Sequence, residues 1–220
     1  MNFANLLDGQ SAAIVIGGTL VATLLRCGTR DCARTLSALA QIGRSRFDAD
    51  NARAELAVQI QEIRQDGLIR AQPHHFGDSE FDEATDALLG SRSLSPLLAA
   101  HEAHRQRRLE LSNRAVRTLA QAAELAPVFG LAGTLVSLSQ LPADGIARAA
   151  FAGAISMAVL TTLYGLLLSN ILLAPLARVV ERAAQAEERE RQKLVDWLTS
   201  EVAPSLPRRR QAARAVDEAA

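Results

Sequence analysis

The stretch "APVFGLAGTLVSLSQL", Ala126 to Leu141, has no charged side chain over 16 residues and decides the fold. It is apolar enough for a lipid bilayer, yet it contains a proline, two glycines, a threonine and two serines. These residue types weaken an isolated helix or add polar groups to it. A membrane helix of this composition is expected to use its small and polar residues against neighbouring helices.

Two more uncharged blocks occur in the chain. The blocks Gly9 to Leu25, Leu125 to Ala143 and Ala149 to Ala177 hold 17, 19 and 29 residues. A helix rises about 1.5 Å per residue and the hydrocarbon core is about 30 Å thick, so a span needs roughly 20 residues. Helices buried in a soluble bundle are usually shorter and keep a polar stripe. The sequence therefore predicts an all-α integral membrane protein with three transmembrane helices and long cytoplasmic helical extensions.

The orientation follows from arginines that gather directly after the first block. Their positive charge places that end in the cytoplasm and the N-terminus outside. A signal peptide is disfavoured, because Met1 to Asp8 holds no Lys or Arg. We expect a first transmembrane helix over 1–25, a cytoplasmic helical region over 26–124, a transmembrane hairpin over 125–177, and a cytoplasmic helix and tail over 178–220. The arginines concerned are Arg26, Arg30, Arg34, Arg44 and Arg46.

Two long helices are predicted to run through the ends of the hairpin. Ser95 followed by Pro96 is typical of a helix start, and nothing stops that helix before Pro127. We expect it to continue through Pro127 with a kink or step. The third span is expected to continue past Pro175 as a charged helix that ends near Pro204.

The uncharged blocks lack the groups that move protons. No Asp, Glu, Lys, Arg or His lies within them, whereas a membrane proton relay needs a titratable side chain. If this chain conducts ions, a partner must supply the acid. The hydroxyls of Thr134, Thr161 and Thr162 are the candidates for lining an ion pathway. The alternative is that each hydroxyl only satisfies a carbonyl of its own helix.

Small residues recur on one side of the second and third spans. Such residues let helix backbones approach closely where no hydrophobic drive exists between helices. We therefore expect Gly130 and Gly133 of the second span to pack against Ala158 and Gly165 of the third.

Other functions find little support in the sequence. The 24 basic residues balance the 24 acidic ones, so no basic nucleic-acid surface is expected. No nucleophile elbow, phosphate loop or paired-carboxylate signature is present, which makes an enzyme the weak hypothesis and predicts no cofactor. His101 and His104 have no third ligand nearby, so no metal is expected. Cys27 and Cys32 are expected to be free thiols.

Two motifs resemble the MotA/TolQ/ExbB proton channel family, closest to its flagellar MotA-type stator members. "APVFGLAGTLVSLSQL" is similar to the family's third membrane helix, APxFGxxGTxxGL. "ISMAVLTTLYGLLLSNILLAPLA", Ile155 to Ala177, resembles the helix that follows in MotA-type members. The N-terminal "LLDGQSAAIVIGGTLVATLL" is similar to their second helix.

The resemblance implies a homopentamer in the bacterial inner membrane, around two copies of a MotB/TolR/ExbD-like single-span partner. The partner's aspartate would bind the transported H⁺, and the three threonines would line the path. Na⁺ is the open alternative, because threonines at these positions occur in relatives of both types. Pro127 and Pro175 match family prolines and would act as hinges.

The sequence also departs from the MotA pattern. The chain begins where the second MotA helix would, which gives three spans, as in TolQ and ExbB. Ser137 stands at a family glycine. Arg64 matches an arginine that contacts the flagellar rotor, but Gln72 stands where an acid is expected. A TolQ/ExbB-like energiser of envelope work and a non-conducting membrane scaffold are therefore the alternatives to a motility stator.

Overall fold

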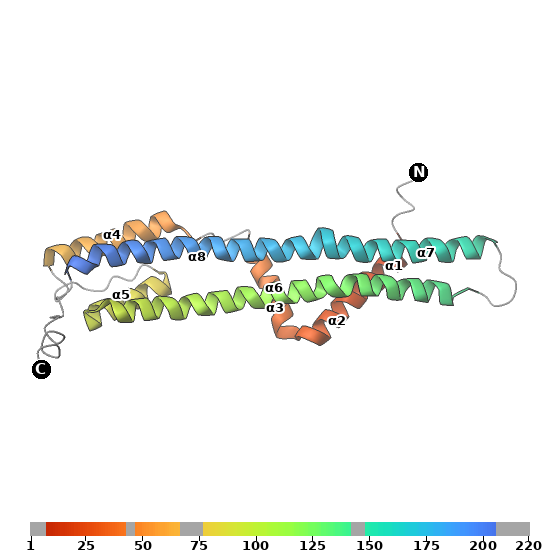
Figure 1. Ribbon diagram of the computed structural model, residues 1–220, viewed down its shortest axis with the longest axis horizontal. Coiled ribbons are helices and arrows are strands. Elements are labelled where there is room, and N and C mark those ends of the chain that lie inside the picture. The colour runs from red at the N-terminus through yellow and green to blue at the C-terminus, as the bar shows by residue number, and fades with distance from the viewer. Residues whose placement is uncertain (1–7, 43–46, 67–76, 142–147, 206–220) are drawn as a thin grey trace, which may run out of the picture. The chain divides into compact units, whose positions relative to one another are not determined.

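The computed structural model describes residues 8–42, 47–66, 77–141 and 148–205 (Figure 1). The elements in these ranges are helical, and three helical stretches are long and apolar enough to cross a membrane: Gly9–Cys27, Leu94–Ser139 and Phe151–Val202. The prediction of an all-α membrane protein with three transmembrane helices is thereby confirmed. The elements are α1 (Gly9–Ala12), the π-helical η2 (Ala13–Gly17), α2 (Gly18–Cys27), α3 (Thr29–Ile42), α4 (Ala49–Asp66), α5 (Ser79–Ser91), α6 (Leu94–Ser139), α7 (Arg148–Leu167), the π-helical η3 (Leu168–Leu173), α8 (Ala174–Val202) and a 3₁₀ turn (Ala203–Ser205).

The two long helices form over nearly the predicted ranges. The helix α6 contains Pro127 without an interruption, and α7, η3 and α8 follow one another through Pro175 to Val202. The uncharged stretches within them are the parts that suit a bilayer, whereas their remaining turns carry many charges. The π-helical turn η3 was not predicted.

The chain divides into two compact units, and α6 and α8 contribute to both. The first unit comprises residues 1–46 and 109–185, and the second comprises residues 47–108 and 186–220. The sequence predicts that the second unit lies in the cytoplasm, and this assignment stays a prediction.

In the first unit, the first span is capped by Asp8 and held against α7. The Asp8 carboxylate accepts from the backbone N–H groups of Ser11 at 3.0 Å and Gln10 at 3.4 Å, which satisfies donors that a helix start leaves free. The Asp8 N–H donates to the Tyr164 hydroxyl of α7 at 3.0 Å. This end of the first span is therefore tied to the hairpin.

The first span ends at Gly28, where the chain turns sharply into α3. Gly28 has a φ of +83°, a conformation that a residue with a Cβ rarely adopts. The helix α3 then packs against α6 and α8 through a small apolar cluster. Its buried members are Ala115, Leu119, Ala177 and Val180, with Ala38 and Leu39 of α3 packed against them.

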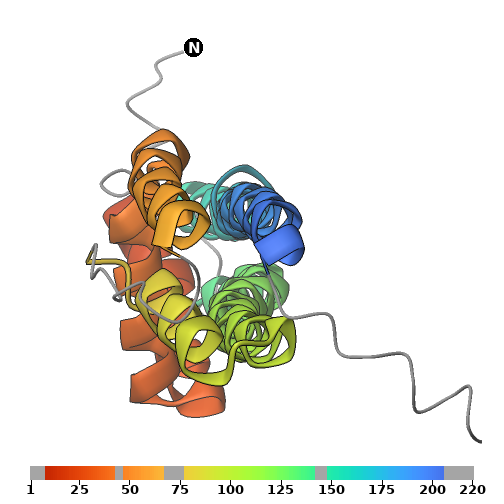
Figure 2. The same ribbon diagram turned by 90° about the vertical axis from the view of Figure 1, so that its left-hand side faces the viewer.

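The second unit combines α4, α5, residues 94–108 of α6 and residues 186–202 of α8, which Figure 2 shows nearly end-on. Each helix turns an apolar stripe toward one shared core, because its apolar residues recur at the three- and four-residue intervals of an amphipathic helix. The helix α5 begins where the Asp78 side chain accepts from the Glu80 N–H at 3.1 Å. The buried core consists of Leu56, Ile60, Ile63, Phe81, Ala84, Leu88, Leu97, Leu194, Val195, Leu198 and Val202.

Candidate functional site

In the first unit α6 and α7 run side by side (Figure 1). Their backbones come into close contact at glycines. A Cβ added to Gly130 would lie 2.9 Å from the Thr161 carbonyl oxygen and 3.3 Å from the Thr162 Cα. A Cβ on Gly165 would lie 2.7 Å from the Ala126 carbonyl oxygen. These separations leave no room for a side chain, so the glycines set the distance between the two helices.

Thr161 closes the same interface. Its side chain is fully buried, and a Cβ added to Gly133 would lie 2.8 Å from both the Cβ and the Cγ2 of Thr161. The Thr161 hydroxyl donates to the Ala158 carbonyl at 2.9 Å. In the single chain Thr161 therefore belongs to the packing between α6 and α7.

Thr134 and Thr162 are only half-buried. Thr134 Oγ1 donates to the Leu131 carbonyl at 2.6 Å, and Thr162 Oγ1 donates to the Ala158 carbonyl at 3.2 Å. A hydroxyl whose proton is bound in this way still has lone pairs that accept a hydrogen bond or contact a cation. Both side chains thus offer oxygen ligands without a fixed charge.

Pro127 leaves one carbonyl of α6 without its usual partner, and α7–η3 supplies a replacement. Proline has no N–H, so it cannot bond to the carbonyl of Ala123, four residues earlier. The hydroxyl of Ser169, in η3, donates to that oxygen at 2.7 Å and is itself buried. The sequence analysis missed this contact. The sequence did contain a signal for this contact, since Ser169 is a hydroxyl residue on the span predicted to pack against the span that contains Pro127.

Pro175 lies directly after the irregular turn η3. A proline in a regular helix crowds the carbonyl four residues earlier, here that of Ile171. In η3 the Ala174 N–H instead bonds to the carbonyl of Ser169, five residues back. The wider turn fits the proline ring, since π-helical turns accommodate such irregularities inside long helices. Both prolines predicted to be hinges therefore lie next to turns with altered hydrogen bonding.

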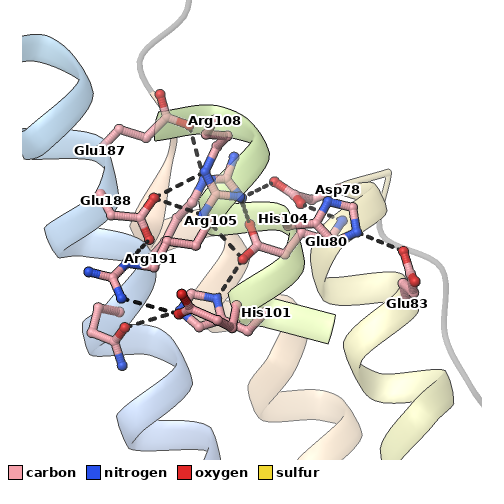
Figure 3. Close-up of polar contacts among 12 residues, drawn as sticks. Asp78, Glu80, Glu83, His101, His104, Arg105, Arg108, Glu187, Glu188 and Arg191 are labelled. Atoms are coloured by element: carbon pink, nitrogen blue, oxygen red, sulfur yellow. Dashed lines mark hydrogen bonds and ion pairs between the residues drawn. The ribbon is translucent and has the colours of Figure 1, made fainter. Parts of the chain in front are cut away.

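A second polar site lies inside the second unit, where α5, α6 and α8 meet (Figure 3). At its centre the Glu80 side chain is 3% exposed. Its Oε1 accepts from His101 Nδ1 at 2.6 Å, and its Oε2 accepts from Arg191 at 2.8 Å and also from Arg108. Burial raises the pKa of Glu80, but the hydrogen bond from His101 and the two guanidinium groups outweigh it and hold the pKa below its usual value.

His101 is placed to carry two protons. Its Nε2 faces the side-chain oxygen of Gln192 at 3.1 Å, and the amide nitrogen of Gln192 donates to Asp196 at 2.9 Å, which fixes the orientation of the amide. Both ring nitrogens therefore face acceptors. The hydrogen bond to Glu80 raises the pKa of His101, which lies on α6 well outside its uncharged stretch, although burial alone would lower it.

Further ion pairs join the same three helices. Arg108 Nη2 lies 2.8 Å from Glu188, and Arg191 donates to Asp78 at 2.9 Å and to Glu187 at 3.0 Å. Sequence reasoning missed this network because its residues come from three helices that are distant in sequence. One signal was present, since Glu80 shares a helical stripe with the buried residues Ala84 and Leu88.

The histidines considered as metal ligands are used in these pairs. His104 Nε2 contacts Glu83 at 2.7 Å, and His101 contacts Glu80. Within the described ranges no group of three or more His, Cys, Asp or Glu side chains is arranged to hold a metal.

Comparison with known proteins identifies the family. The family model described as "MotA/TolQ/ExbB proton channel family" matches residues 83–193, half of the chain. The chain belongs to the MotA/TolQ/ExbB proton channel family. The family is one of proton channels and not a class of enzymes, and the resemblance found in the sequence is confirmed.

Relatives within this family share modest identity. Motility protein A of Aquifex aeolicus is 26% identical over 186 residues, 80% of this chain and 72% of that protein. Motility protein A of Cereibacter sphaeroides is 22% identical over 197 residues, 89% of this chain and 78% of that protein. The flagellar MotAB stator complex from Bacillus subtilis contains a chain with the same fold, with a TM-score of 0.79, 17% identity, and coverage of 100% of this chain and 91% of that one.

Arg64, which the family resemblance predicts to contact the rotor, lies on the surface of the second unit. It forms an ion pair with Glu201 of α8, and the two side chains are 57% and 30% exposed. The structure thus leaves the arginine accessible but gives it a partner in its own chain. Gln72, the predicted departure from the rotor motif, lies outside the described residues.

Large apolar side chains remain exposed on the uncharged stretches of this family member. Leu135 on α6, Val159 on α7 and Ile171 in η3 are each more than half exposed. Exposed large apolar side chains on such stretches are typically covered by lipid or by other protein chains. It is consistent with a membrane location and with packing against further subunits.

Proposed function

We propose that this chain is the channel-forming subunit of an ion-driven stator in the bacterial inner membrane, and that the ion is H⁺. Membership of a proton channel family and similarity to proteins named Motility protein A support this assignment. In this proposal the complex converts ion-motive force into flagellar rotation.

A partner chain supplies the proton-binding acid in this mechanism. The uncharged blocks of the present chain contain no titratable side chain, and such a group is needed to carry protons through a bilayer. The solved relatives are complexes of MotA with MotB. We therefore propose a homopentamer around a dimer of a MotB-like single-span protein that carries an aspartate.

The observation that carries the proposal is the state of Thr134 and Thr162. Both side chains are half-buried, and both hydroxyls donate to a carbonyl of their own helix. Each can accept a hydrogen bond from a protonated carboxyl group or contact a hydrated cation, and neither holds a charge that would trap the ion. Thr161 packs behind them and keeps their two helices in register.

Movement in this mechanism arises beside Pro127 and Pro175. Neutralisation of the partner's aspartate removes a charge from the interface and favours a different packing of the helices. The altered turns next to the two prolines are the points at which α6 and α8 can bend. The long charged ends of these helices would carry that movement to the rotor.

The test is ion flux through proteoliposomes that contain the full chain and its single-span partner. An imposed membrane potential should drive proton uptake, read by a pH-sensitive dye, and Thr162→Val and Thr134→Val should each slow it. Thr23→Val is a matched control, because Thr23 is a hydroxyl of the first span that bonds to its own helix at the Thr19 carbonyl. Flux in the absence of partner contradicts the proposal, as does equal flux in both threonine variants and wild type. Flux driven by a sodium gradient and not by a proton gradient would assign Na⁺ as the ion.

A further inference from the structure

A charged pocket lies in the first unit where the first span ends. Its volume is about 510 Å³, and it is lined by Cys27, Gly28, Thr29, Arg30, Asp31, Arg34 and Arg114. The lining thus includes three arginines and one aspartate. The mechanism proposed above uses none of these residues.

The three arginines come from two different helices. Arg30 and Arg34 lie one turn apart on α3, whereas Arg114 belongs to α6. The positive-inside rule explains arginines on the segment that leaves the membrane. It does not explain their convergence with an arginine that is distant in sequence.

Nearby carboxylates form ion pairs with only some of these arginines. Asp31 pairs with Arg34 at 3.6 Å, and Glu110, which is outside the pocket lining, pairs with Arg114. For Arg30 no ion pair is found among the residues that the structure describes. The first turn of α3 adds backbone N–H groups and the positive end of a helix of 14 residues. The pocket is thus suited to an anion.

The pocket lies next to the predicted cytoplasmic ends of the first and second spans. The Cys27 thiol donates to the side-chain oxygen of Gln121 at 2.8 Å, and both residues lie within a turn of the uncharged blocks that begin at Leu125 and end at Leu25. Arg114 precedes Gln121 by two turns, about 10 Å along the helix. Arg114 therefore lies on the side of the pocket farther from the membrane, and its charge is carried at the end of a long side chain.

An apolar surface adjoins the pocket on the membrane side. Leu25, two residues before Cys27, is 83% exposed, and Val21 and Leu24 of the same span are also exposed. A ligand with a phosphate head and acyl chains would contact the arginines and this surface together. Arginine forks match the oxygen geometry of phosphate better than that of a single-atom anion.

We propose that this pocket binds the phosphate headgroup of an anionic phospholipid from the cytoplasmic leaflet. The bound headgroup joins α3 to α6 at the membrane surface, and its acyl chains lie along the exposed face of α2. The apolar cluster that includes Leu39 of α3 and Leu119 of α6 keeps the two sides of the pocket together. This site is independent of the ion pathway.

The first test is lipid binding by the purified full-length chain in a neutral detergent. Native mass spectrometry would measure retention of phosphatidylglycerol and of phosphatidylcholine with the same acyl chains. We expect preferential retention of phosphatidylglycerol, and about fivefold weaker binding for each of Arg30→Gln, Arg34→Gln and Arg114→Gln. Arg178→Gln is the control, because Arg178 directly follows an uncharged block but does not line the pocket. Equal weakening by Arg178→Gln, or no lipid preference in the wild type, overturns the proposal.

The second test uses the protein with its pocket arginines intact. The Cys32→Ser variant leaves Cys27, which lines the pocket, as the cysteine that a water-soluble maleimide can modify. Anionic vesicles should slow this modification severalfold relative to neutral vesicles. In the Cys27→Ser variant the maleimide modifies Cys32, which lies outside the pocket lining, so its rate shows the effect of vesicle surface charge alone. Equal slowing in both variants contradicts the proposal. Equal protection of Cys27 by inorganic phosphate in neutral vesicles would identify a soluble-phosphate site and also contradict it.

Discussion

The hydroxyl of Ser169 donates to the carbonyl oxygen of Ala123 at 2.7 Å, across the contact between the second and third spans. It replaces the N–H that Pro127 lacks, so the proline is accommodated by a neighbouring helix and not by its own. A helix-breaking residue can persist in a membrane on this condition, because the bilayer offers no water to satisfy the freed carbonyl.

This relationship predicts that Pro127→Ala reduces the loss of stability caused by Ser169→Ala. Ser169→Ala should destabilise the protein by about 1 kcal/mol, because it leaves the buried Ala123 carbonyl without a donor. In a Pro127→Ala background the substituted residue would supply its own backbone N–H, so the same serine substitution should cost much less. Thermal unfolding in detergent would measure the double-mutant cycle. Ser139→Ala is the control, since Ser139 donates to the Val136 carbonyl of its own helix. Identical costs of Ser169→Ala in the two backgrounds would contradict the assignment.

The close contact of α6 and α7 predicts that Gly165 tolerates no side chain. The Cβ of Gly165→Ala would lie 2.7 Å from the Ala126 carbonyl oxygen and 3.1 Å from the Gly130 Cα, so the helices must separate. We expect a loss of about 1–3 kcal/mol, read as a lower melting temperature of the detergent-solubilised protein. Gly153→Ala in the same helix should be neutral or stabilising, because nothing lies within 4 Å of the added Cβ. A similar melting temperature for both variants would show that α7 can move away freely.

The network around Glu80 predicts a defined pH dependence for the second unit. The folded pKa of His101 is raised above its ordinary value of about 6.5. Its contribution to stability is therefore complete below that value and is lost as the pH rises through the folded pKa. The pKa of Glu80 is lowered, so its contribution is complete above its ordinary value and is lost as the pH falls through the folded pKa.

Trp197 allows this pH dependence to be measured. It is the one tryptophan of the chain and packs against the core of the second unit. Denaturant unfolding followed by its fluorescence should show stability that decreases from neutral to alkaline pH in the wild type. His101→Gln should be less stable at neutral pH and should lose most of that slope. The control His104→Gln removes a ring that contacts Glu83, whose side chain is 63% exposed, and should leave the slope nearly unchanged. An unaltered slope in His101→Gln would contradict the assignment.

The membrane spans could be predicted from sequence because the uncharged blocks are long and contiguous. The packing of α6 on α7 was also accessible, since small residues at helical spacing imply a close contact. For the Ser169–Ala123 bond the sequence offered only a hydroxyl residue on the span that packs against Pro127, and the π-helical turn that contains Ser169 was not predicted. The burial of Glu80 was signalled only by its helical spacing from Ala84 and Leu88. Its partners His101 and Arg191 could not be predicted, because they come from helices that are distant in sequence.

The ion pair between Arg64 and Glu201 predicts how rotor contact can be separated from folding. An exposed pair of this kind contributes at most about 1 kcal/mol, so Arg64→Glu should fold normally. If Arg64 engages the rotor, Arg64→Glu should reduce swimming in soft agar. The double variant Arg64→Glu/Glu201→Arg forms the intrachain pair again with exchanged charges, but it should not restore swimming. Glu201→Gln is the control, because it frees Arg64 without changing its charge and should preserve swimming. Full restoration by the exchanged pair would show that Arg64 acts only within its own chain.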